Sequence, residues 1–278
     1  MRLSRNNKIL IYTLLIIFSS IIFLPFYGMV ITSLKTDEQI QSVSSLGGML
    51  IASPINWKNY PDVFRYVPFL RYYWNTFYVT ILSIIGAVIS CSLVAYGFAR
   101  FKWPGRDIVF LIMLSTMMLP PQVTVIPIFI LFSKIGWVDS FKPLWVPSYF
   151  GIPFSIFLLR QFLMGIPKDL EDAAKIDGCS SLGIFWRVMV PLIKPALLAV
   201  IVFQFLWAWN DFINPLIYLH DVKLMTLSLA MYSFQWLHRT EWHLVMAAAT
   251  MMTIPAIAIF FMAQKYFIEG ITLTGMKG

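Results

Sequence analysis

The sequence predicts an all-α transmembrane protein with about six membrane-spanning helices and a polar helix-turn-helix insert between the fourth and fifth. Of its 278 residues, 59% are hydrophobic and only 12% are charged, and the mean hydropathy is +0.76. These values exceed what the core of a soluble domain of this length requires. The apolar windows lack the two-residue alternation of barrel strands, and a chain in lipid must then satisfy its backbone by forming helices.

Six apolar windows are long enough to cross about 30 Å of hydrocarbon as helices. They cover residues 9–33, 75–98, 108–132, 144–162, 196–219 and 244–267. No linker or low-complexity tract separates them, so we expect one transmembrane domain over residues 1–278. The longest connection, residues 34–73, is expected to be an outer loop. A loop of this size can contact a soluble binding protein or form a lid on its own helices.

The Lys and Arg residues predict the orientation in the membrane, because these side chains resist transfer across it. Most of the 21 Lys and Arg residues precede the first window, follow the second, surround the insert or close the chain. Both termini and the insert are therefore expected in the cytoplasm, and the four windows before the insert agree with this. The net charge of +8 suits an inner surface facing anionic lipid, so no nucleic-acid partner is implied.

The insert, at about residues 163–195, is the most informative part of the chain. Gly178 can supply the positive φ that ends one helix, and Ser180 or Ser181 can cap the next. On the first helix, Glu171 and Lys175 are spaced for a stabilising ion pair. The second helix carries an apolar stripe, which we expect another protein to cover. The stripe consists of Leu182, Phe185, Trp186, Met189 and Val190.

The fifth window has one polar face, which is unsuited to lipid. The face consists of Gln204, Trp207, Asp211, Asn214 and Tyr218, with Asn210 adjacent. Amide and carboxylate groups pair with sugar hydroxyls, and an indole ring offers a flat surface to a sugar ring. The face is therefore a candidate sugar pathway, and adhesion between subunits is an equal alternative. Pro215 frees the carbonyl of Asp211, so we expect the helix to bend there.

Gln122 is a second pathway candidate. Pro120, Pro121 and Pro127 interrupt the third window around it. Broken helices at membrane depth are tolerated chiefly where they face protein or a water-filled cavity.

Neither a metal site nor a cofactor site is predicted. His238 and His243 are five residues apart, one too many for a helical metal pair, and the two cysteines suggest neither a metal site nor a disulfide. Residues 270–275 have the glycine spacing of a phosphate-binding loop, but Met276 stands where that loop needs Lys. An ATP-driven process would thus need a separate nucleotide-binding subunit.

The insert is similar to the EAA loop in the membrane subunits of ABC importers. The matching parts are Asp172-Ala173-Ala174, Gly178 and Val188-Met189-Val190-Pro191. The longer pattern resembles carbohydrate permeases, with further similar stretches at 120–122, 126–127, 209–212 and 275–278. Some positions depart from the family pattern. Asp172 replaces the usual Glu, and Cys179 replaces a common Ala. Val188 and Val190 stand where the family has Ile and Leu. These changes keep charge sign and apolar character.

The resemblance implies a permease subunit of a binding-protein-dependent importer for a sugar or oligosaccharide, in a bacterial or archaeal cytoplasmic membrane. The chain itself would not be an enzyme. It would form a heterodimer with a homologous permease, dock a dimer of ATP-binding subunits that hold ATP-Mg, and receive sugar from an extracytoplasmic binding protein. The residues expected to couple to the ATPase are Glu171, Asp172, Ala173, Ala174, Asp177, Gly178, Leu182, Phe185, Trp186, Met189 and Pro191.

An ion-coupled secondary transporter is the alternative. It would also be all-helical with a polar stripe, but Asp211 is its only acidic candidate at membrane depth. A membrane enzyme is a weaker alternative, because the sequence lacks a cluster of His, Cys and carboxylate residues with ligand spacing.

Overall fold

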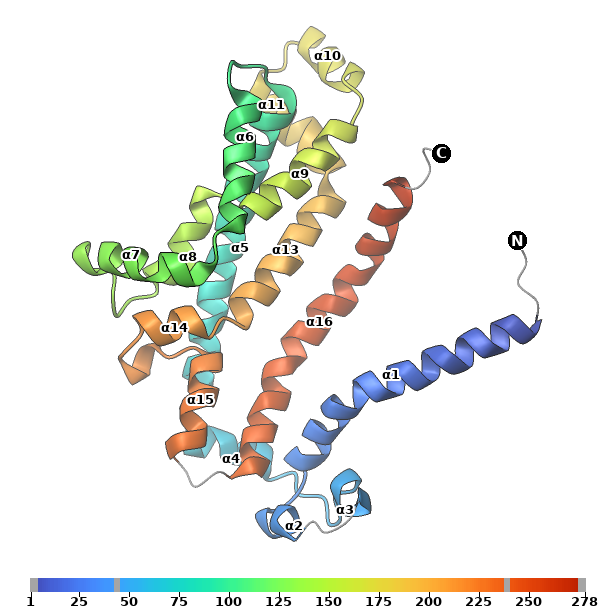
Figure 1. Ribbon diagram of the computed structural model, residues 1–278, viewed down its shortest axis with the longest axis vertical. Coiled ribbons are helices and arrows are strands. Elements are labelled where there is room, and N and C mark those ends of the chain that lie inside the picture. The colour runs from blue at the N-terminus through green and yellow to red at the C-terminus, as the bar shows by residue number, and fades with distance from the viewer. Residues whose placement is uncertain (1–4, 43–45, 238–240, 275–278) are drawn as a thin grey trace. The chain divides into compact units, whose positions relative to one another are not determined.

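A computed structural model describes residues 5–42, 46–237 and 241–274 of the chain (Figure 1). Within these ranges every regular element is a helix, in agreement with the predicted all-α class. The chain forms two compact units, Met1–Leu70 with Ala230–Ile254 and Arg71–Leu229 with Pro255–Gly278. His238 lies outside the described residues. So do residues 275–278, which carry part of the family resemblance.

Three helices are long and apolar enough to cross a membrane. They are α1 (Arg5–Ser33), α5 (Phe69–Arg100) and α16 (Trp242–Thr274). Three further candidate spans are helix pairs joined at a sharp bend, so the described residues contain up to six spans. This range includes the predicted number of about six.

In the first unit, the loop predicted at residues 34–73 contains three short helices and the start of α5. The three are α2 (Asp37–Gln41), α3 (Leu46–Leu50) and α4 (Asn59–Tyr66). The buried Asn59 amide donates to the carbonyls of Ser33 and Lys35 at 2.8 and 2.7 Å. Lys35 Nζ in turn donates to the carbonyl of Gly48 at 2.6 Å. The connection is therefore held together by hydrogen bonds that are buried or partly buried.

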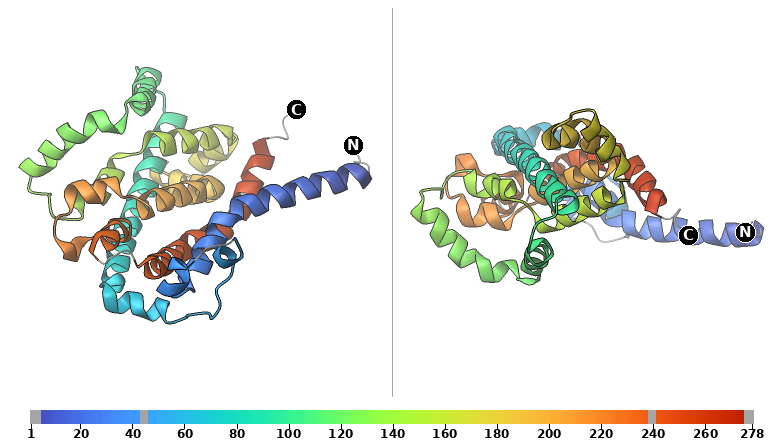
Figure 2. Two further views of the ribbon diagram at one scale, coloured as in Figure 1. Left: turned by 60° about the horizontal axis from the view of Figure 1, so that its bottom comes forward. Right: turned by 90° about the horizontal axis from the view of Figure 1, so that it is seen from above.

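In the second unit, α6 (Arg106–Ser115) and the 3₁₀ turn η1 (Thr116–Met118) lead into α7 (Pro121–Lys134). The two halves meet at an angle of 100° (Figure 2). Leu119 is extended because it precedes a proline, and Pro121 occupies a first-turn position where no N–H is required. The predicted break in the third window is confirmed.

The core of the second unit joins α5, α6, α9 (Pro153–Gly165), α13 (Lys194–Trp209) and the insert. Its buried members are Cys91, Ala95, Tyr96, Phe98, Phe110, Ile156, Leu159, Leu163, Ala174, Ile184, Phe185, Met189, Ile193, Ala196, Leu197 and Val200. Small residues such as Ala95 and Ala196 let neighbouring helices approach closely. The insert thus shares one core with the apolar helices.

The fifth window is not one helix. The bend expected near Asp211 and Pro215 is a full break at residues 210–212, because α13 ends at Trp209 and α14 (Ile213–Tyr218) begins four residues later. The Asn210 side chain donates to the carbonyl of Leu206 at 2.8 Å, and Asp211 Oδ1 accepts the backbone N–H of Asn214 at 3.2 Å. Such local bonds compete with the helix, and Pro215 then fits the first turn of α14, where its missing N–H costs nothing.

Candidate functional site

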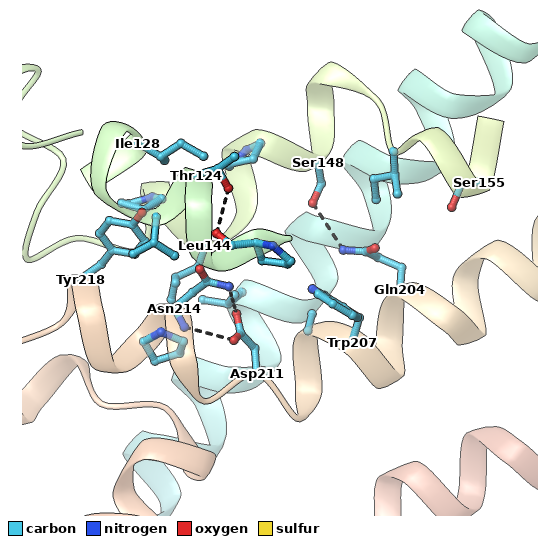
Figure 3. Close-up of a pocket in the computed structure, with 18 of the residues that line it drawn as sticks. Thr124, Ile128, Leu144, Ser148, Ser155, Gln204, Trp207, Asp211, Asn214 and Tyr218 are labelled. Atoms are coloured by element: carbon cyan, nitrogen blue, oxygen red, sulfur yellow. Dashed lines mark hydrogen bonds between the residues drawn. The ribbon is translucent and has the colours of Figure 1, made fainter. Parts of the chain in front are cut away.

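A cavity of about 580 Å³ lies in the second unit (Figure 3). Its walls come from α5, α7, α8 (Lys142–Trp145), the 3₁₀ turn η2 (Val146–Phe150), α9, α13 and α14. The lining is mainly apolar, with a few polar groups. Those groups belong to Thr124, Ser148, Ser155, Gln204, Asp211, Asn214 and Thr226. The volume and the sparse polar groups are typical of a small-molecule site.

The structure brings five of the seven predicted pathway residues to this cavity. They are Gln204, Trp207, Asp211, Asn214 and Tyr218. Asn210 does not line it, because its amide caps α13. Gln122 is exposed on α7 and does not line it either, although its neighbour Pro121 does.

Hydrogen bonds fix the polar groups of the cavity wall. The buried Gln204 donates from Nε2 to Ser148 Oγ at 3.3 Å. Asn214 donates from Nδ2 to Asp211 Oδ2 at 2.9 Å. Trp207 differs, because it is 70% exposed and its ring borders the cavity between these two pairs (Figure 3). The wall therefore offers an accessible aromatic ring beside preorganised amide and carboxylate groups.

The backbone carbonyl of Asp211 is not the free acceptor that we expected from Pro215. It accepts a hydrogen bond from the hydroxyl of Ser228. Ser228 is held at this place because the preceding residue, Leu227, donates its N–H to Thr76 Oγ1 at 2.7 Å. The local sequence around Pro215 cannot show a donor that arrives from a later helix.

The opposite wall of the cavity, which contains Ser148 and Ser155, was not predicted from the sequence. A signal was present, because Pro147, Gly151 and Pro153 interrupt the fourth window as the prolines interrupt the third. Gly151 has a φ of 94°, which favours glycine, and the chain turns there between η2 and α9.

The insert folds as helix, turn, helix. Helix α10 (Asp169–Ile176) ends where Gly178 adopts a φ of 80°, and the N–H groups of Gly178 and Cys179 donate to carbonyls of the last turn, both at 3.0 Å. Ser180 then caps α11 (Ser181–Ile184) by accepting the N–H of Gly183 at 3.2 Å. The predicted roles of Gly178 and Ser180 in the turn are confirmed, and Figure 1 shows both helices at one end of the second unit.

The predicted apolar stripe is not a single exposed surface. Phe185 and Met189 are fully buried by their own chain, whereas Leu182 and Trp186 are 64% and 50% exposed. The stripe lies partly on the π-helical turn η3 (Phe185–Met189), whose inner side packs into the core. Its five members therefore divide between two sides, and the expectation that another protein covers Phe185 and Met189 is wrong.

The exposed apolar side chains of the insert include two outside the predicted stripe, Leu170 and Ile176. We use the term docking set for Leu170, Ile176, Leu182 and Trp186, all of them exposed. The other exposed coupling candidates are Asp172, Ala173, Asp177, Gly178 and Pro191, and the buried ones are Glu171, Ala174, Phe185 and Met189.

Glu171 belongs to a buried ionic cluster. Its Oε2 lies 3.5 Å from Arg100 Nε, and the two side chains are 9% and 3% exposed. The Tyr96 hydroxyl donates to Glu171 Oε1 at 3.4 Å, and Lys175 Nζ lies 3.7 Å from the same oxygen. The predicted pair with Lys175 is therefore present. The pair with Arg100 was not predicted, because the two residues lie far apart in the sequence.

No group of three or more potential metal ligands among His, Cys, Asp and Glu occurs in the described residues. With up to six candidate spans among its described residues, the chain has the architecture of a polytopic membrane protein. The chain belongs to the family of binding-protein-dependent transport system inner membrane components, whose model matches residues 89–272.

Relatives agree with this family over almost the whole chain. An arabinooligosaccharide transport permease, AraQ of Bacillus subtilis, is 31% identical and covers 96% of this chain and 95% of its own. The melibiose, raffinose and stachyose import permease MelC of the same organism is also 31% identical, with full coverage of both chains. These relatives are transport permease subunits and not enzymes.

The fold resembles that of chains in two solved structures. A chain from the crystal structure of a bacterial ABC transporter for the acidic polysaccharide alginate has a TM-score of 0.85 at 23% identity, with 96% of this chain and 99% of that chain covered. A second such structure holds a periplasmic protein with bound alginate pentasaccharide, and its TM-score is 0.66.

Proposed function

We propose that this chain is a permease subunit of an ABC importer and that its cavity forms part of the pathway for a sugar or oligosaccharide. The cavity carries the proposal, because it places an accessible indole ring beside amide and carboxylate groups that pair with hydroxyls. The family membership and the sugar substrates named for AraQ and MelC support it.

The proposal includes three partners for this chain. A homologous permease completes the pathway as a heterodimer, and an extracytoplasmic sugar-binding protein delivers the substrate, with the connection at residues 34–73 as its contact. A pair of ATP-binding subunits that hold ATP-Mg docks on the insert, whose exposed apolar docking set needs a cover. The chain then lies in a bacterial or archaeal cytoplasmic membrane, with both termini and the insert in the cytoplasm.

The cavity proposal predicts that Trp207→Ala weakens sugar binding by about tenfold, because it removes the stacking surface, worth roughly 1 kcal/mol or more. Binding of arabinotriose, raffinose and maltotriose to the purified importer would be measured without the binding protein, because that protein sets the apparent KM for uptake. Trp103→Ala is the matched control, since Trp103 is also exposed but lies outside the cavity. Equal effects of the two changes would contradict the assignment.

Uptake that survives ATP depletion but collapses with an uncoupler would favour an ion-coupled carrier.

The docking proposal predicts that Leu182→Asp lowers the yield of co-purified ATPase by more than about tenfold, because an unpaired carboxylate buried in an interface costs several kcal/mol. The measurement is the ratio of ATPase to permease after affinity purification in detergent. Ile135→Asp is the control, since Ile135 is exposed at the end of α7, outside the insert. Retention of the ATPase by Leu182→Asp would exclude the docking set as the contact surface.

A further inference from the structure

We infer that Glu171 and Arg100 form a charge-held latch that fastens the insert to α5 and carries motion of the insert into that helix. This inference rests on the proposed coupling of the insert to an ATPase. The chain itself connects the insert only to α9 and α13. The latch would therefore add a third, non-covalent route into the helices.

The end of α5 contacts three successive parts of the insert. Arg100, the last residue of α5, donates to the carbonyl of Ile166, which lies just before α10, at 2.9 Å. It also faces the Glu171 carboxylate on α10. The Tyr96 hydroxyl, one turn earlier, lies 3.4 Å from the carbonyl oxygen of Ser181 at the start of α11 and shares its single proton between that oxygen and Glu171 Oε1. The last turn of α5 is therefore joined to the entry segment and to both helices of the insert.

The latch lies in the shared core and is screened from water. The Arg100 and Glu171 side chains are 3% and 9% exposed, and the Tyr96 ring packs on the Phe185 ring with centroids 5.2 Å apart. Lys175 is the other cation near Glu171, but its side chain is 52% exposed and also pairs with Asp172 at 3.2 Å. Arg100 is therefore the main buried partner of the Glu171 charge.

The distances indicate that charge, more than hydrogen bonding, holds this pair. The separation of 3.5 Å between Arg100 Nε and Glu171 Oε2 is too long for a good hydrogen bond, and Arg100 Nε has no hydrogen-bond partner among the described residues. Coulomb attraction falls off only as the inverse of distance and is weakly screened at a buried site. Replacing both residues with uncharged polar side chains should therefore release the latch.

The test uses the double variant Arg100→Gln, Glu171→Gln in the complete importer reconstituted into liposomes, because this change leaves neither charge buried without a partner. ATP hydrolysis and uptake of the transported oligosaccharide are measured in the same vesicles. We expect a fall of about tenfold in the sugar transported per ATP hydrolysed, the size of a typical coupling free energy between sites. Asp169→Asn is the control, since it makes the same carboxylate-to-amide change at an exposed position on α10.

An assembled double variant that transports as much sugar per ATP as the unaltered importer would overturn the latch. Loss of assembly in that variant would also overturn it, because the pair would then serve stability alone. Failure of the proposed function is distinguishable from both results. In that case the unaltered importer itself would show no ATP-driven uptake.

Discussion

Replacing Gly178 with valine should abolish most ATP-driven uptake while the chain still reaches the membrane. Gly178 has a φ of 80°, and a Cβ built there would meet nothing within 4 Å, so the penalty is one of backbone conformation and not of space. A residue with a side chain costs about 1–2 kcal/mol in this left-handed region, and a β-branched residue is more strongly disfavoured. The strain falls on the turn that fixes α10 against α11.

The measurement is uptake in cells, normalised to the amount of the chain in isolated membranes. We expect valine to reduce uptake by about tenfold or more, the scale of a coupling free energy between sites. Gly178→Asn is the matched control, because asparagine adopts positive φ readily and should retain most uptake. Similar loss with both residues would point to a need for glycine itself, such as close approach of a partner, and would contradict the conformational explanation.

Local sequence chemistry predicted the parts of the fold that depend on neighbouring residues. The turn at Gly178 needs only one residue able to adopt a positive φ and one capping serine, and both are visible in the sequence. The break at Pro120 likewise follows from the backbone restrictions of proline. Long apolar windows predicted α1, α5 and α16 because length and composition alone decide whether a helix can span lipid.

Features that depend on contacts between distant residues could not be predicted in the same way. Periodicity placed Phe185 and Met189 on the stripe with Leu182, but it cannot show which side of the helix meets the core. Glu171 pairs with Arg100, which lies 71 residues earlier, and nothing near either residue indicates the other.

The cavity contains residues that the sequence could predict and residues that it could not. Helical spacing predicted that Gln204, Asp211 and Asn214 share one face. The three residues do line one cavity although the helix breaks between them, because α14 resumes in a compatible orientation. The same spacing could not exclude Asn210, whose short amide bonds to its own helix, nor supply Ser148 from the facing wall.

Neutralising Glu171 alone should destabilise the protein far more than neutralising it together with Arg100. Glu171→Gln leaves the Arg100 guanidinium buried with the carbonyl of Ile166 and without its carboxylate. Removing the charge of one partner of a buried ion pair lowers the free energy of unfolding by about 3–5 kcal/mol, because the remaining charge is desolvated without compensation. The double variant Arg100→Gln, Glu171→Gln removes both charges, so most of this penalty should disappear.

The unfolding free energies of the two single variants and the double variant, measured in one detergent, form a double-mutant cycle that isolates the interaction. Asp172→Asn supplies the exposed comparison on the same helix. Its carboxylate is 63% exposed and pairs only with Lys175 among the described residues, so its loss should cost less than about 1 kcal/mol. If Glu171→Gln proves no more costly than Asp172→Asn, water reaches the cluster and the pair is not the buried interaction that its 3% and 9% exposed side chains indicate.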